Sequence, residues 1–202
     1  MQEQKYTLSF TAAPLLANES VRLAECYAKE HDWAKVREIA VRDNLLQARR
    51  ASSLKRIVSE LVARLKTLRD DEIDFLVQAD YPAREYMLWI AVCRCYAFIA
   101  DFATEVVHHQ FMSGKTSVTH EDYTVFFNAK LQWHPELDAL TDSTRGKLRQ
   151  VLFKMLRESG ILDARKDIIP VLPPQAFLDI LRSGGEHEVM YFPIHSLLRE
   201  KR

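Results

Sequence analysis

The chain has 202 residues, with 28 lysines and arginines balanced by 28 aspartates and glutamates, so its formal net charge is zero. This balance argues against a highly basic nucleic-acid coat protein, although positive charge can still be concentrated locally. Hydrophobic residues make up 48% of the chain, which is enough for a buried core and argues against disorder. Five glycines and no regular run of period-two strands predict a mainly α protein.

The first half of the chain carries successive helical patterns, namely 17–29, a helix capped by Asp32, a basic helix within 47–68, and 70–77. Three helices with the basic one third suggest a helix-turn-helix-like unit. Apolar residues from 83 to 111 predict one long buried helix as the spine of the fold. The segment 112–118 is rich in hydroxyl residues and predicts a linker, so we expect two packed helical subdomains, 1–115 and 116–202.

The segment 47–68 joins a basic, hydroxyl-rich helix start to an apolar stripe. Residues at steps of three and four predict the inward face, which consists of Leu54, Ile57, Val58, Leu61, Val62, Leu65 and Leu68. The opposite side is predicted to be positive and includes Arg64, Lys66 and Arg69, with Glu60 the one acid from 49 to 69. Free N–H groups at a helix start favour an anion. The predicted phosphate contacts are Arg49, Arg50, Ser52, Ser53, Lys55 and Arg56.

A second basic helix is predicted from Asp142 to Gly160. Asp142, Ser143 and Thr144 are alternative N-caps, and Gly160 suits a C-terminal cap. The predicted phosphate contacts of this helix are Thr144, Arg145, Lys147 and Arg149. Between the linker and this helix, we expect a helix over 119–131 with Asp122 at capping-box distance, and a short helix beginning at Pro135.

After Gly160, two short apolar pieces flank a polar ARKD segment and could form a small β-hairpin. Helix, helix, basic helix and hairpin is the order of a winged helix, which would place Arg165 and Lys166 at a wing tip near DNA phosphate. The prolines that follow keep an ordinary loop open as an alternative. The remaining chain predicts a helix over 175–181 and a short strand over 189–192.

Enzymatic signatures are absent from the sequence. It contains no Gly-rich phosphate loop, no His-x-x-x-His pair, no Cys-x-x-Cys repeat and no G-x-S-x-G elbow. We therefore expect a protein without catalytic residues, metal, cofactor or small-molecule substrate. Five aromatic residues could stack on single-stranded bases: Trp33, Trp89, Phe126, Phe127 and Trp133. Their helical spacing favours the core instead. Phe126 and Phe127 are adjacent, so one could face the core and the other solvent.

Three features bear on localisation. An odd set of three cysteines without metal-ligand spacing is typical of reduced thiols in the cytoplasm. The N-terminal residues do not resemble a secretion signal. The longest apolar region, 86–103, contains Arg94 and Asp101 and is shorter than the about 20 residues of a membrane span. We therefore expect a cytoplasmic protein that does not enter the membrane.

Five longer blocks give the chain a family resemblance: YTLSFTA at 6–12, NLLQARRASSLKR at 44–56, LWIAVCRCYAFIADFA at 88–103, FFNAKLQWHPEL at 126–137 and TRGKLRQVLFKMLRESG at 144–160. Through them the chain resembles the BrxA family of bacteriophage exclusion (BREX) phage-defence systems. The resemblance covers most of the chain and implies a cytoplasmic, mainly helical DNA-binding protein that works beside the other components of such a system.

Together, residues and resemblance lead to a working hypothesis of a non-enzymatic protein that contacts the phosphates of double-stranded DNA through two basic helix starts. Three other interpretations remain open at this point. The basic faces could dock on acidic surfaces of other defence proteins, the chain could be an RNA-binding helical domain, or a Lys/Arg-rich helix face could simply be solvated.

Overall fold

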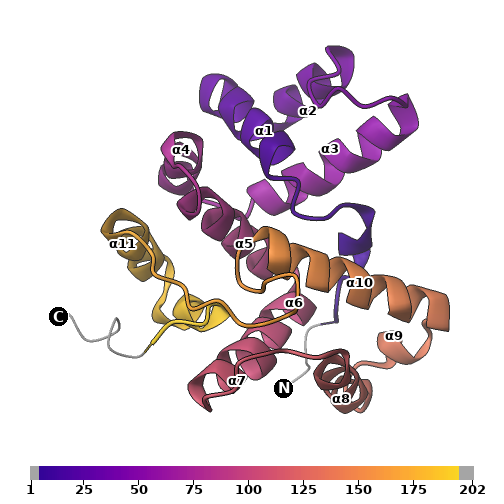
Figure 1. The fold of residues 1–202 in the computed structure, drawn as a ribbon. Coiled ribbons are helices and arrows are strands. Elements are labelled where there is room, and N and C mark those ends of the chain that lie inside the picture. The colour runs from indigo at the N-terminus through magenta and orange to yellow at the C-terminus, as the bar shows by residue number, and fades with distance from the viewer. Residues whose placement is uncertain (1–4, 196–202) are drawn as a thin grey trace.

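Helices provide nearly all the regular structure of residues 5–195, which are the part of the chain that the computed structural model describes (Figure 1). The predicted mainly α class is confirmed. The elements follow in the order η1 (Ser9–Ala12), α1 (Ala17–Glu30), α2 (Trp33–Arg42), α3 (Ala51–Leu65), α4 (Asp70–Gln78), α5 (Ala83–Cys95), α6 (Ala97–Phe102), η2 (Ala103–His108), α7 (His109–Met112), α8 (His120–Leu131), α9 (Pro135–Asp138), α10 (Asp142–Glu158), α11 (Gln175–Gly184) and η3 (Glu186–Tyr191).

The first three long helices form a unit in which α1, α2 and α3 contact one another pairwise. The Asp32 carboxylate caps α2 by accepting a hydrogen bond from the Ala34 N–H at 2.7 Å, as expected for an N-cap residue. The predicted inward face of α3 is confirmed, since six of its seven residues are buried and Ile57 is half-buried. Burial of that stripe fixes the direction of α3 and turns its first residues toward solvent.

The predicted single helix over 83–111 is wrong, because the spine is divided into α5, α6, η2 and α7. The break lies at Tyr96, whose φ of −130° and ψ of 97° are extended. This conformation turns the Tyr96 hydroxyl onto the buried Glu60 carboxylate. Apolar residues continue on both sides of the break, so periodicity could not reveal it. No helix within residues 5–195 is both long and apolar enough to cross a bilayer.

The predicted hairpin forms as a minimal antiparallel turn rather than as regular strands. The Asp163 N–H donates to the Asp167 carbonyl at 3.0 Å, and the Ile169 N–H donates to the Ile161 carbonyl at 2.9 Å. The segment before α8 pairs with the same turn, through an isolated bridge between Ser117 and Asp167. The strand predicted over 189–192 is wrong, because residues up to 191 belong to the 3-10 helix η3.

The N-terminal segment before α1 packs against the second half of the chain. Its 3-10 turn, η1, contacts both α3 and α10. The Leu15 N–H donates to the Glu158 carboxylate of α10 at 2.8 Å, and the Tyr6 N–H donates to the Glu136 carboxylate at 2.6 Å. The segment therefore holds the two basic helices in a fixed relation to each other.

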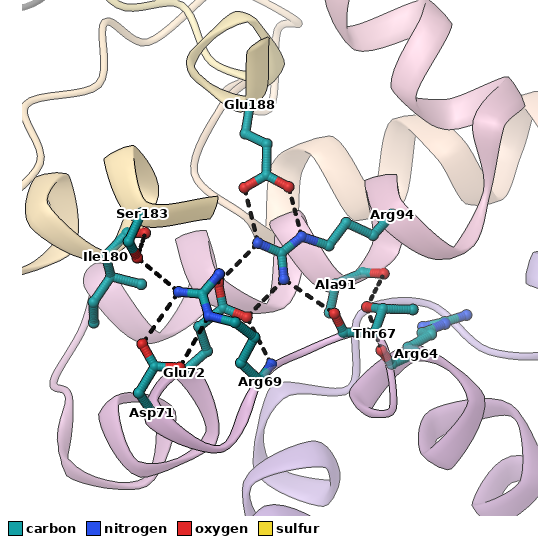
Figure 2. A network of polar contacts seen from close by, with 10 residues as sticks. All are labelled: Arg64, Thr67, Arg69, Asp71, Glu72, Ala91, Arg94, Ile180, Ser183 and Glu188. Atoms are coloured by element: carbon teal, nitrogen blue, oxygen red, sulfur yellow. Dashed lines mark hydrogen bonds and ion pairs between the residues drawn. The ribbon is translucent and has the colours of Figure 1, made fainter. Parts of the chain in front are cut away.

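The C-terminal segment makes the reverse crossing and packs on the first half of the chain (Figure 2). Arg94 of α5 is bonded to Glu72 of α4 at 2.6 Å and to Glu188 of η3 at 2.6 Å. Both carboxylates are buried, so this arginine neutralises two charges inside the protein. The division at 115/116 remains a prediction, and ordered segments from each side of it pack on the other.

Candidate nucleic-acid interface

The start of α3 is an open cationic surface. Arg50 occupies the N-cap position, and no side chain caps the first turn of the helix. Ser52 is exposed and Ser53 is half-buried, so both lie within reach of a ligand at the helix start. Four exposed cations lie here, and none of them has a polar partner within the described chain: Arg49, Arg50, Lys55 and Arg56. Unpaired cations and free N–H groups together favour a phosphate.

The positive side predicted for the rest of the segment is wrong for two of its three cations. Arg64 is only 3% exposed, and its guanidinium bonds to the Glu60 carboxylate at 2.9 Å and to the carbonyl groups of Pro14 and Ala13. Arg69 is paired with two acids of α4. These two arginines hold the fold together, whereas the third predicted cation, Lys66 at the C-cap of α3, is exposed.

The start of α10 is capped more completely than that of α3. The Thr141 hydroxyl, one residue before the predicted caps, accepts a hydrogen bond from the Thr144 N–H at 3.3 Å. The two threonine hydroxyls are also bonded to each other at 3.0 Å. The predicted end is confirmed, since Gly160 follows the C-cap with a φ of +72°. Thr144 therefore serves the helix cap.

The three predicted cations of α10 differ in their surroundings. Arg145 donates to the Leu137 and Asp138 carbonyl groups at 3.4 and 3.1 Å, and its guanidinium lies 5.4 Å from the centre of the Phe127 ring. The exposed Lys147 is bonded to Gln150 at 3.3 Å. The half-buried Arg149 has no hydrogen bond or ion pair among the described residues. Arg145 closes the end of α9, whereas Arg149 keeps its charge available.

The hairpin turn brings its cations toward α10. The Asp163 carboxylate accepts hydrogen bonds from the N–H groups of Arg165 and Asp167, which closes the turn. The Arg165 side chain is 87% exposed. Partial burial, together with the positive charges of Lys166 and Arg149, lowers the pKa of His120 at the start of α8. The turn, α8 and α10 therefore meet in one cationic region.

The first turns of α3 and α10 both lie at the right-hand edge of the molecule as drawn in Figure 1. From that edge the two helices run toward the centre, and η1 lies between them and contacts both. The predicted contacts thus form two groups, one around the start of α3 at that edge and one that extends from the start of α10 to the hairpin turn, which follows the other end of α10 nearer the centre of the view. The described residues contain no group of three or more histidine, cysteine or acidic side chains arranged to hold a metal.

Comparison with known families gives a match over most of the chain. The family model described as BrxA matches residues 4–185. The chain belongs to the BrxA family. The resemblance drawn from the five sequence blocks is therefore confirmed.

Two curated relatives of this BrxA-family chain carry the name "BREX protein BrxA". The protein from Bacillus cereus (strain H3081.97) is 28% identical over 90% of this chain and 90% of its own length. The protein from Escherichia coli O9:H4 (strain HS) is 28% identical over 94% of this chain and 87% of its own length. A crystal structure of an uncharacterized protein from Magnetospirillum magneticum shares the fold, with a TM-score of 0.79, 19% identity, and coverage of 94% of this chain and 98% of that one.

Sequence reasoning missed several residues of this BrxA-family surface. His120 and Tyr123 of α8 lie close to the cations of α10 and the hairpin turn, a proximity that only the fold creates. Gly146 had a signal in the sequence, because a glycine inside a helical run is unfavourable for the helix relative to alanine. The core assignment of Trp133 is wrong, since its side chain is 68% exposed, and Phe126 and Phe127 are both buried rather than split.

Proposed function

We propose that this BrxA-family chain is a non-enzymatic, cytoplasmic component of a BREX phage-defence system and that it binds double-stranded DNA through the starts of α3 and α10. The observation that carries the proposal is the group of exposed cations before and within the first turns of α3, which has no polar partner in the described chain. The relatives named as BREX proteins support the defence role and a partnership with other BREX components.

The order of elements around α10 also supports DNA as the partner. The helices α8, α9 and α10 and the hairpin turn follow one another in the order of a winged helix, where the third helix enters the major groove. Arg149 and the turn residues Arg165 and Lys166 then lie where a winged helix meets the DNA backbone. Such contacts position a protein on DNA without reading bases, so weak sequence selectivity is expected.

A salt series tests this function. Fluorescence anisotropy of a labelled DNA duplex should show an affinity that falls steeply with salt, with a log–log slope on the order of −3 to −4 if about four phosphates are neutralised. The combined Arg49→Ala, Arg50→Ala, Lys55→Ala and Arg56→Ala variant should bind several-fold more weakly and keep its helical circular dichroism, because none of these residues is buried.

A matched control removes the same number of charges elsewhere. The exposed cations Lys29, Lys154, Arg157 and Arg182, which lie away from both helix starts, can be changed to alanine together. This control should bind DNA nearly as the unmodified protein does. A flat salt response, or equal losses in both variants, would refute phosphate binding at α3. Stronger binding to RNA than to duplex DNA in direct competition would instead identify an RNA-binding domain.

A further inference from the structure

A groove of about 240 Å³ lies between α8 and α10. It is lined by Tyr123, Thr124, Phe127 and Asn128 from α8, and by Asp142, Arg145, Gly146 and Arg149 from α10. Sites that enclose a drug-sized ligand measure roughly 300–1,000 Å³, so this groove suits a single chemical group of a larger ligand better than a whole cofactor. Its position beside the first two turns of α10 adds the positive end of a long helix.

The Tyr123 hydroxyl is the unusual polar group of this groove. Tyr123 is only 4% exposed, and its buried hydroxyl has no hydrogen-bond partner among the described residues. A buried hydroxyl without a partner is costly, so such groups normally donate to another polar atom. Burial raises the pKa of Tyr123, and the positive charges of Arg149 and Arg145 oppose that rise. The hydroxyl therefore stays protonated near neutral pH, ready to donate beside two cations.

Gly146 leaves the same groove open on the side of α10. A Cβ atom built at this position would meet no atom within 4 Å, so packing inside the protein does not require glycine here. Glycine in a helix interior costs about 1 kcal/mol relative to alanine, and its presence in the second turn of α10 is unfavourable for the helix alone. Close approach of the backbone to a ligand is one established use of glycine.

The charges around the groove favour an anion. Arg145 is already bonded to carbonyl groups at the end of α9 and lies 3.6 Å from the Asp138 carboxylate. Arg149 has no such partner within the described chain, and Asp142 is the one acid that lines the groove. Two guanidinium groups against one carboxylate leave the groove positive.

We infer that the groove between α8 and α10 binds one phosphate group, which accepts a hydrogen bond from the Tyr123 hydroxyl and pairs with the Arg149 guanidinium, while Gly146 leaves room for it against the helix. In its main form, the inference assigns this phosphate to the DNA backbone and therefore rests on the proposed function. A free phosphate ion has the same chemistry and is the second source to be tested.

Tyr123→Phe is the sharpest test, because it removes one hydroxyl oxygen and neither charge nor ring. A hydrogen bond to a charged group is worth enough that its loss should weaken duplex affinity by about tenfold. The log–log salt slope should stay unchanged, since no charge is removed. Arg149→Gln should weaken binding and also reduce the slope by about one. The control Tyr86→Phe changes a buried tyrosine of α5, outside the groove, and should bind as the unmodified protein does.

Gly146→Leu gives an independent test that fills the groove. Leucine is a better helix former than glycine, so the melting temperature should not fall, while duplex affinity should fall as far as in Tyr123→Phe. Melting temperatures of all variants show whether they fold. One combined result would overturn the inference. In it, Tyr123→Phe and Gly146→Leu are both folded, both bind duplex DNA as tightly as the unmodified protein does, and the next assay shows no phosphate effect.

A thermal-shift assay with inorganic phosphate separates the two sources. If the groove takes free phosphate, the ion should raise the melting temperature more than sodium chloride at equal ionic strength, and Tyr123→Phe should abolish the difference. If the groove is specific for the DNA backbone, the variants should lose duplex affinity while inorganic phosphate leaves the melting temperature of the unmodified protein unchanged. Absence of duplex binding by the unmodified protein would refute the proposed function. The phosphate assay would then still show whether the groove binds phosphate. Failure of both assays overturns the inference.

Discussion

Arg145 and Arg149 lie one helical turn apart on α10, yet the fold uses them differently. Arg145 donates to two carbonyl groups at the end of α9 and covers the Phe127 ring. Arg149 keeps its guanidinium free of hydrogen bonds and ion pairs within the described chain. Since both residues are basic and helical, sequence reasoning gave them the same role. Their neighbours in space make Arg145 a structural residue and Arg149 the stronger candidate for a DNA contact.

Substitution by alanine should separate these two roles. Arg145→Ala should lower the free energy of unfolding by about 1–3 kcal/mol, because it removes the ring contact and leaves carbonyl groups without their donor. Arg149→Ala should change stability by less than about 0.5 kcal/mol, since it removes no polar contact. Urea denaturation measures the first effect and duplex anisotropy the second. A destabilised Arg149→Ala with unchanged DNA affinity would contradict this assignment.

At the scale of elements, the start of α8 lies between α10 and the hairpin turn. His120, the first residue of α8, packs edge-on against Phe153 of α10, with ring centroids 4.9 Å apart. Partial burial and the charges of Lys166 and Arg149 lower its pKa in the free protein. A DNA phosphate bound to these cations would offset their charge and raise the His120 pKa again. DNA binding should therefore be coupled to proton uptake by this histidine.

The coupling predicts a pH dependence of defined sign. In the free protein, the His120 pKa is lower than in the unfolded chain. The resulting contribution to stability is present above the pKa of the unfolded state and is lost as the pH falls through the pKa of the folded state. Duplex affinity should therefore rise several-fold as the pH falls from 7.5 to 6. Anisotropy at constant ionic strength measures this change. His120→Gln should show a flatter profile, and an identical profile would exclude His120 as the source.

The whole molecule is held together by segments that cross from one half of the chain to the other. The N-terminal segment reaches α10, and the C-terminal segment reaches α4 and α5 through Arg94. Trp89 of α5 also donates to the Tyr191 carbonyl at 2.9 Å. Because each half supplies part of the other's packing, the relation between α3 and α10 depends on both crossings.

Loss of the Arg94 side chain should affect the entire protein. Arg94→Ala leaves Glu72 and Glu188 buried without this partner and should cost about 3–5 kcal/mol of unfolding free energy. Unfolding should remain a single transition, with tryptophan fluorescence and far-ultraviolet circular dichroism changing together. Lys35→Ala breaks an exposed ion pair and serves as the control, with a far smaller loss of stability. Two separate transitions in the unmodified protein would contradict the coupling of the halves.

The sequence by itself determined the helical class, the inward stripe of α3, the cap at Asp32 and the stop at Gly160, and it left the segment that carries Arg165 and Lys166 open between a hairpin and a loop. These features depend on neighbours within a few residues, whose spacing and backbone preferences can be read along the chain. Only the tertiary structure decided that Arg64 is buried, that the spine breaks at Tyr96, and that Tyr123 and Arg149 share one groove. Those outcomes depend on residues that are distant in sequence, and local periodicity contains no information about which of them meet.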